Sequence, residues 1–171
     1  MIIGILQETK SDENRVAITP EGTEIVTQRG HRVIIERGAG IGSGFEDTDY
    51  TAHGAVIEAN SQEIFGQADM ILRVKEPQPA EFEMLREDQI YFSYLHLAAS
   101  EQTTRRFMER TTITIAYETI QKADGSLPLL IPMSEIAGQM AVQEGAKYLE
   151  MAQGGDGVFL GGVPGVDPGI V

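Results

Sequence analysis

The stretch MILRVK at Met70–Lys75 is the clearest indication of the fold class, because a short and mostly apolar run ends there on a charged side chain. Similar runs rich in Ile and Val recur along the chain, at Ile2–Leu6, Val33–Glu36, Ile90–Leu95 and Ile113–Tyr117. Continuous rather than alternating runs are typical of strands buried on both faces. Polar stretches of helical length separate them. This alternation predicts an α/β fold, Rossmann- or flavodoxin-like, in which βαβ units build a parallel sheet with helices on both faces.

Helices are expected between these strands. The first is signalled by Thr19 as its cap and by Pro20 at its first position. Shorter helices are expected at about Thr48–Gly54, Ser61–Gln67, Pro79–Arg86 and Glu101–Arg110. From Ser134 to about Met151 the pattern becomes strongly helical, which predicts that the domain ends in a long helix.

The pattern divides the chain into three parts. Residues 1–133 are expected to form a substrate or catalytic domain, and residues 134–152 a linker helix between domains. After Gln153 the composition changes to GGDGVFLGGVPGVDPGIV, which is typical of a linker and carries no closing signal. We therefore expect residues 153–171 to be the start of a further, truncated domain.

The charge balance excludes several classes of partner. Thirteen Lys and Arg stand against 26 Asp and Glu, for a formal net charge of −13. Such a chain repels phosphate backbones and anionic lipids, so neither nucleic acid nor a membrane is expected as partner. The absence of cysteine excludes disulfides and zinc–thiolate sites and fits a reducing cytoplasm. No stretch approaches the roughly 18–20 apolar residues of a membrane span.

Ionisable side chains follow several of the predicted strands. Lys75, His96 and Glu118 each come directly after a strand, and Arg15 follows the first strand across a short polar loop. Because ligands of open parallel sheets bind beyond the carboxyl ends of the strands, these four side chains are expected along one edge. Arg and Lys suit a carboxylate and a carbonyl oxygen, and His passes protons near neutral pH. The sequence therefore predicts a site that moves a proton beside the carboxylate of a 2-oxo or 2-amino acid.

Each of these residues also has a simpler interpretation. Lys75 is also consistent with a solvated strand end beside Glu76, and His96 with a hydrogen-bonded core histidine. Arg15 follows the acidic stretch SDEN and is consistent with a surface pair. Only their shared position at the strand ends favours a common site.

Two glycine-rich stretches do not fit a nucleotide site. GAGIGSGF at Gly38–Phe45 has Ser43 where the third glycine of G-x-G-x-x-G belongs, which favours a flexible turn. GGVPG at Gly161–Gly165 lacks the spacing and the following helix. No His and carboxylate spacing indicates a metal site.

Six motifs, in order along the chain, carry a resemblance to a known family. They are KSDENRVAITPEG at Lys10–Gly22, RGAGIGSGFEDTDY at Arg37–Tyr50, RVKEPQP at Arg73–Pro79, YLHLAA at Tyr94–Ala99, IAYETIQKADGSLPLLIPMSEIAGQMA at Ile115–Ala141 and GGDGVFLGGVPGV at Gly154–Val166. Together they cover nearly the whole chain, which resembles the N-terminal substrate-domain portion of the alanine dehydrogenase family.

The resemblance implies an NAD-dependent oxidation of L-alanine to pyruvate and ammonium, and the reverse amination. It implies that Arg15 and Lys75 hold the substrate, that Tyr94 lies against it, and that His96 is the general acid/base. It also implies cofactor contacts near the nicotinamide end of the cleft, by Leu130, Met133 and Ser134. Members of the family usually form homo-oligomers, most often hexamers.

The resemblance also implies that part of the machinery is missing. The family's main NAD-binding domain would begin near residue 153 and its Rossmann core is absent here, so the isolated chain is expected to have no turnover. One alternative is the NAD-binding part of a proton-translocating transhydrogenase, which shares the ENRVAITP-like opening but typically lacks the histidine of YLHLAA. Another is a truncated binding or oligomerisation module without chemistry.

Overall fold

The computed structural model describes residues 1–169, so the last two residues of the range 153–171 lie outside the described part. The chain forms two compact units, Met1–Thr119 and Ile120–Val171, and each is described by itself. The expected division at residues 133 and 152 is not tested by these units and stays a prediction. Within residues 1–169, no helix is both long and apolar enough to cross a membrane.

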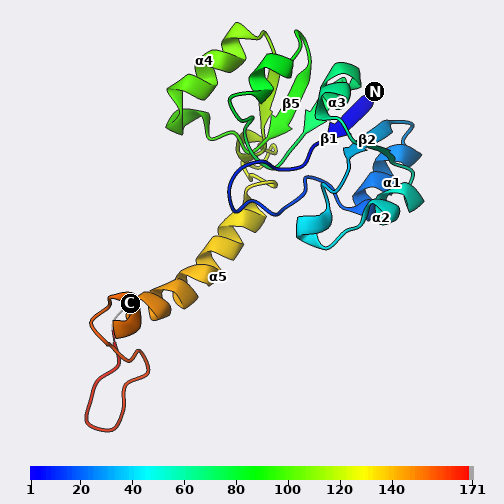
Figure 1. Ribbon diagram of the computed structural model, residues 1–171. Coiled ribbons are helices and arrows are strands. Elements are labelled where there is room, and N and C mark those ends of the chain that lie inside the picture. The colour runs from blue at the N-terminus through cyan, green and yellow to red at the C-terminus, as the bar shows by residue number, and fades with distance from the viewer. Residues whose placement is uncertain (170–171) are drawn as a thin grey trace. The chain divides into compact units, whose positions relative to one another are not determined.

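The first unit is built on a six-stranded sheet (Figure 1). Its strands are β1 Ile2–Ile5, β2 Arg32–Glu36, β3 Val56–Glu58, β4 Met70–Leu72, β5 Ile90–Ser93 and β6 Ile113–Ala116. Their order is β3-β2-β1-β4-β5-β6, and every neighbouring pair is parallel. The α/β prediction is therefore confirmed. Strand β3 was not predicted, because three half-exposed residues at a sheet edge leave little apolar signal.

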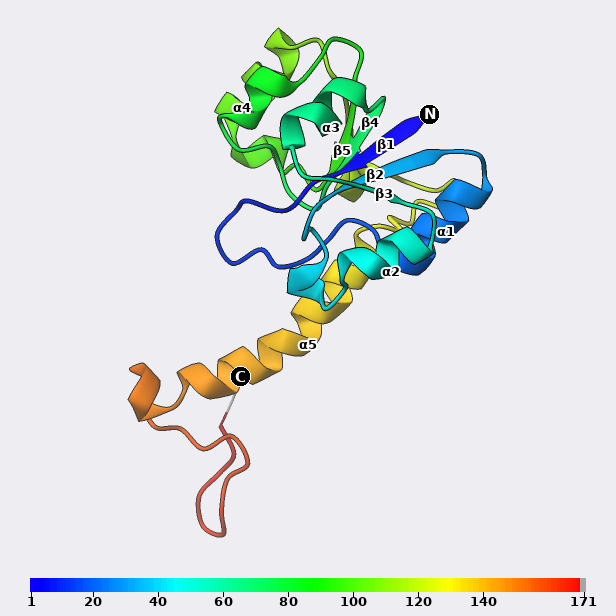
Figure 2. The same ribbon diagram turned by 45° about the vertical axis from the view of Figure 1, so that its right-hand side comes forward.

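Helices connect the strands and cover both faces of the sheet (Figure 2). The α-helices are α1 Pro20–Gln28, α2 Asp47–Ala52, α3 Ser61–Gln67 and α4 Glu101–Glu109. The 3-10 turns are η1 Ile41–Ser43, η2 Glu81–Met84, η3 Leu97–Ala99 and η4 Tyr117–Thr119. The helix expected at residues 79–86 is only the turn η2. The Glu81 carboxylate there binds the Gln78 N–H at 2.6 Å and pairs with Arg73, and Leu85 is already extended.

Two hydrophobic cores lie on opposite faces of the sheet. On one face Ile64 and Phe65 of α3 and Phe107 of α4 pack against the sheet. On the other face Tyr50 of α2 packs with Ile3, Ile5, Val33 and Ile35. Burial on both faces is the reason why the strands appear in the sequence as continuous apolar runs.

Helix α1 begins at the cap that the sequence predicts. The Thr19 hydroxyl accepts a hydrogen bond from the Gly22 N–H at 3.2 Å, and Pro20 occupies the first turn. We expect Thr19→Ala to lower the free energy of unfolding by about 1 kcal/mol, because one N–H of the first turn loses its partner. Urea denaturation measures the loss, and Thr19→Ser should recover most of it. An unchanged Thr19→Ala protein would show that the cap does not contribute.

The second unit contains the long helix α5, Ile131–Tyr148, followed by the 3-10 turn η5, Met151–Gln153. A helix was expected here, but it begins three residues before Ser134. Pro132 lies in the first turn, where its fixed φ and missing N–H are tolerated, so the helix begins ahead of it. No residue of α5 is buried.

Candidate active site

The site expected from the sequence lies at the carboxyl edge of the first unit's sheet. The strand order reverses between β1 and β4, which makes this pair the topological switch point. Glu8 follows β1, Lys75 follows β4, His96 follows β5 and Glu118 follows β6. Ligands of open parallel sheets bind beside such a point.

A buried arginine occupies the switch point itself. Arg73 is 0% exposed, and its guanidinium pairs with Glu8 at 3.2 Å and with Glu81. It also donates to the Gln7 carbonyl oxygen at 3.0 Å. Burial alone would lower the pKa of Arg73, but Tyr91 and the two carboxylates raise it above its usual value. Arg73 therefore stays charged and joins the ends of β1 and β4.

Two hydrogen bonds fix the turn that carries Lys75. The Val74 N–H donates to Glu8 Oε1 at 2.7 Å, and the Tyr91 hydroxyl donates to the Lys75 carbonyl oxygen at 3.1 Å. Burial raises the pKa of Tyr91 well above its usual value, so the hydroxyl keeps its proton near neutral pH. Lys75 itself is half-buried. It is therefore not a fully solvated strand end.

Arg15 lies in the loop between β1 and α1 and forms a bidentate ion pair with Glu13. Arg15 Nε donates to Glu13 Oε1 at 2.8 Å and Nη2 to Oε2 at 2.6 Å. This hydrogen bonding lowers the pKa of Glu13, and the charge of Lys75 lowers it further. Glu13 is therefore within electrostatic reach of both cations. Arg15 therefore pairs with one of the acidic residues of SDEN, but the pair is not purely a surface one, because the Glu13 side chain is only 8% exposed.

Tyr94 lies between Arg15 and the turn η4 that follows β6. Its ring packs edge-on against Tyr117 with centroids 4.9 Å apart. Burial raises the pKa of Tyr94, Arg15 lowers it and Glu118 raises it. The phenol is thus close enough to feel both the guanidinium and the carboxylate.

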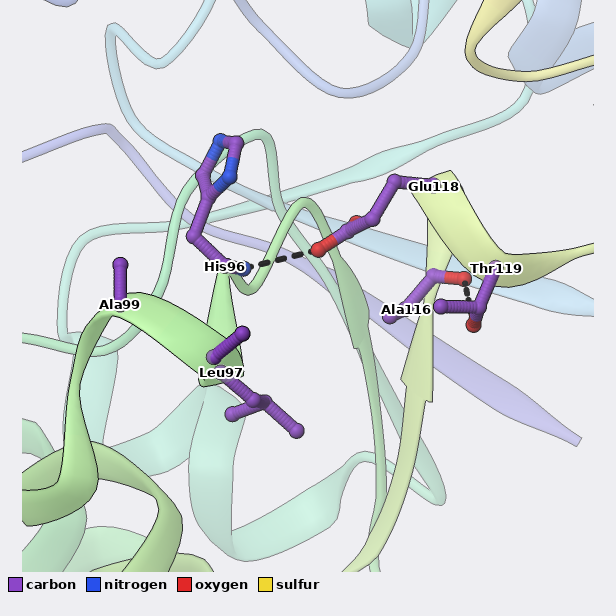
Figure 3. Close-up of a pocket in the computed structure, with 7 residues that line it drawn as sticks. His96, Leu97, Ala99, Ala116, Glu118 and Thr119 are labelled. Carbon is purple, nitrogen blue, oxygen red and sulfur yellow. Dashed lines mark hydrogen bonds between the residues drawn. The ribbon is translucent and has the colours of Figure 1, made fainter.

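His96 has a left-handed backbone, with φ 49° and ψ 39°, and a side chain open to solvent. Such a backbone is uncommon for a residue with a Cβ and persists only where its surroundings enforce it. The Glu118 carboxylate supplies that constraint, because Oε1 accepts the His96 N–H at 2.8 Å (Figure 3). The same oxygen also accepts the Leu95 N–H at 3.2 Å. The interpretation of His96 as a buried core histidine is wrong.

A hollow of about 290 Å³ opens beside His96. Its other lining residues are Leu97, Ala98, Ala99, Ala116, Glu118 and Thr119. Mostly small apolar residues therefore line this hollow together with His96 and Glu118, which suits a small ligand with an apolar part and one charged end.

The three residues expected at the nicotinamide lie in the second unit. Leu130 precedes α5, and Met133 and Ser134 lie in its first turn. Their role stays a prediction, because the two units are described separately.

Two side chains of this edge were not predicted as part of the site. A signal for Arg73 existed, because a charged residue within an apolar strand run requires a buried partner. No local pattern indicates its partner Glu8, since the two residues are 65 positions apart in the sequence. Within residues 1–169, no group of three or more His, Asp or Glu is arranged to hold a metal ion.

Comparison with known proteins identifies the family. A family model described as "Alanine dehydrogenase/PNT, N-terminal domain" matches residues 4–137. The chain belongs to the alanine dehydrogenase/PNT family. It is 56% identical over its full length to an alanine dehydrogenase from Methanococcus maripaludis and 52% identical to one from Mycobacterium tuberculosis. It spans 46% of each, so it matches about half the length of these relatives.

Two solved structures are similar to this chain. An L-alanine dehydrogenase matches 99% of the chain at 47% identity with a TM-score of 0.87, over 46% of its own length. A transhydrogenase from Sinorhizobium meliloti matches 72% of the chain at 26% identity with a TM-score of 0.68, over 35% of its length. The dehydrogenase is therefore the more similar of these two in both sequence and fold.

Proposed function

We propose that this chain is the substrate-binding part of an NAD-dependent alanine dehydrogenase, which converts L-alanine, NAD⁺ and water into pyruvate, ammonium, NADH and a proton. One observation supports the proposal above the others. Lys75 and His96 follow strands β4 and β5, and Arg15 lies in the loop after β1. All three are therefore at one edge of a parallel sheet, beside its topological switch point. The relatives that match this chain over its full length carry the name alanine dehydrogenase.

The two cations would hold the substrate. The planar fork of Arg15 already binds one carboxylate in bidentate geometry, that of Glu13, and would bind the substrate's carboxylate in the same way. Lys75, on a turn fixed by Glu8 and Tyr91, would pair with the substrate and polarise its carbonyl oxygen. Tyr94 would lie against the substrate, within reach of Arg15.

His96 would move the protons of the reaction. When alanine is oxidised, its amino nitrogen leaves as ammonium and water supplies the new carbonyl oxygen, so protons must leave the water and reach the nitrogen. A neutral imidazole takes such a proton and returns it near neutral pH. The hollow beside His96 offers space for the substrate's methyl group between small apolar side chains.

The family implies NAD as the hydride acceptor. The described residues do not form the main NAD-binding domain of that family. The glycine-rich loop after β2 leads into the 3-10 turn η1 rather than into the N-terminus of an α-helix, so it does not fit the phosphates of a dinucleotide. We propose only that Leu130, Met133 and Ser134 contact the nicotinamide end. Turnover by this chain alone is therefore not expected, and an assay of NADH formation with alanine tests that expectation.

Substrate binding is the direct test of the proposal. We expect isothermal titration calorimetry of the chain with pyruvate to show binding, and Arg15→Ala to weaken it at least about tenfold, because the charged hydrogen bonds to the carboxylate are lost. Arg105→Ala is the matched control, because Arg105 is exposed on α4 and forms an ion pair with Glu101 of the same helix. It should leave the affinity unchanged.

Absence of pyruvate and alanine binding would contradict the substrate role and favour a binding or oligomerisation module. Binding that survives Arg15→Ala would place the carboxylate elsewhere. The transhydrogenase alternative is less favoured, because His96 is present and the similarity to the transhydrogenase structure is lower.

Three further features belong to the same proposal. We propose a cytoplasmic location, because the cysteine-free sequence needs no oxidising compartment. We propose self-association, hexameric as is usual in the family. The formal net charge of −13 disfavours nucleic acid and membrane surfaces as partners.

A further inference from the structure

The glycine-rich stretch Gly38–Phe45 has no part in the proposed reaction, although it is one of the most distinctive motifs of the sequence. It connects β2 to α2 and contains the turn η1. Among its contacts in the structure are those with Asn14, in the loop between β1 and α1 that also carries Arg15.

Two neighbouring residues of the stretch meet at one backbone carbonyl. A Cβ on Gly42 would lie 2.6 Å from the carbonyl oxygen of Asn14 and 3.1 Å from its Cα, so only glycine fits there without a shift. The Ser43 hydroxyl donates to the same carbonyl oxygen at 3.0 Å. Asn14 directly precedes Arg15, so both contacts act on the peptide bond that joins these two residues.

The other end of that peptide bond is also fixed. The Arg15 N–H donates to Glu13 Oε1 at 3.0 Å, and the same carboxylate holds the guanidinium. With its carbonyl held by Ser43 and its N–H held by Glu13, the peptide plane cannot rotate without breaking a hydrogen bond. The direction in which the Arg15 side chain leaves the backbone is therefore set by this plane.

Tyr50, which follows the glycine-rich stretch, also contacts the loop that carries Arg15. The hydroxyl of buried Tyr50 donates to the Ile18 carbonyl oxygen at 2.9 Å. A Cβ on Gly40 would lie 2.6 Å from Tyr50 Cε2, so the absent side chain makes room for that ring. The segment Gly38–Tyr50 thus holds the Arg15 loop on both sides of the arginine.

We propose that Gly42 and Ser43 are positioning residues, which hold the Asn14–Arg15 peptide so that the guanidinium faces the substrate's carboxylate. The inference rests on the proposed function, in which Arg15 binds that carboxylate. A bidentate pair requires both partners in one plane, so a small rotation of the backbone costs affinity even though the charge remains.

Pyruvate binding and limited trypsin digestion test this inference together. We expect Gly42→Ala to weaken pyruvate binding about tenfold, as when a charged hydrogen bond is lost, and to speed tryptic cleavage after Arg15 by a similar factor. Ser43→Ala removes only the hydroxyl, so it should cause the same changes to a smaller extent. Gly66→Ala in α3, where an added Cβ meets nothing within 4 Å, is the matched control and should change neither quantity.

A double-mutant cycle separates positioning from a general loss of structure. In an Arg15→Ala background, Gly42→Ala should have no further effect on pyruvate affinity, because the group that it positions is gone. An equal loss in both backgrounds would overturn the proposal, as would wild-type affinity and digestion in Gly42→Ala. If Gly42→Ala does not fold, Ser43→Ala decides by the same criteria.

The two proposals fail in different ways. A wild-type chain that binds no pyruvate would contradict the proposed function, and the digestion rates would still show whether Gly42 and Ser43 hold the Arg15 loop. Pyruvate binding that depends on Arg15 but not on Gly42 or Ser43 would overturn the positioning inference alone.

Discussion

Arg73→Ala is expected to lower the free energy of unfolding by about 3–5 kcal/mol, because it leaves buried carboxylates without their partner. Glu8 is 2% exposed and Glu81 12% exposed in their side chains, and both pair with the guanidinium. The Gln7 carbonyl oxygen loses a donor as well. Urea denaturation followed by circular dichroism measures the change.

Arg73→Lys should recover only part of this loss. A lysine ammonium is a point charge and cannot serve Glu8, Glu81 and a backbone carbonyl in the plane that the guanidinium spans. Arg105→Ala is the control, because its pair with Glu101 is 70% and 77% exposed and contributes at most about 0.5 kcal/mol. A loss below about 1 kcal/mol for Arg73→Ala would show that water enters and solvates the two carboxylates.

The sequence predicts most of the fold because the sheet is buried on both faces. Each central strand is then a continuous apolar run, and such runs stand out at Ile2–Leu6 and Ile90–Leu95. Strand β3 lacks this signal because it lies at the edge of the sheet and Val56 is 45% exposed. The segment at residues 79–86 has helical composition, but the pairing of Glu81 with Arg73 and the Gln78 N–H sets its conformation.

The sequence predicts only those residues of the candidate site that lie close to the end of a predicted strand. Lys75, His96 and Glu118 come two or three residues after the ends of β4, β5 and β6, so a parallel sheet places them at one edge whatever else the chain does. The groups that hold them come from distant positions, and no local pattern reports such pairs. Glu118 binds the His96 backbone across 22 residues, and Ser43 binds Asn14 across 29.

The glycine-rich stretch shows the same limit. Its spacing is enough to reject a dinucleotide loop, because Ser43 stands where a glycine is needed. The positive contact, Gly42 against the Asn14 carbonyl, depends on how two loops from different strands pack. Only the structure could supply it.

Alkaline pH is expected to destabilise the protein through Tyr50. This side chain is 0% exposed and its hydroxyl donates to the Ile18 carbonyl oxygen at 2.9 Å. Burial, followed by the charges of Asp49 and Glu21, raises its pKa from 10.0 to about 12. Between these two values the folded protein keeps a proton that the unfolded chain has lost. The stabilisation is therefore complete below pH 10 and is lost as the pH rises from 10 to 12.

Tyr50→Phe isolates this contribution. The wild type should lose about 2 kcal/mol more of its free energy of unfolding than Tyr50→Phe between pH 9 and pH 12, because two units of pKa correspond to about 2.7 kcal/mol when titration is complete. Tyr50→Phe also loses a hydrogen bond, but that offset is the same at every pH. Urea denaturation across this range measures the difference, with Tyr148→Phe as control because Tyr148 is 59% exposed. Parallel losses in the wild type and Tyr50→Phe would mean that the hydroxyl of Tyr50 ionises in the folded protein as readily as in the unfolded chain.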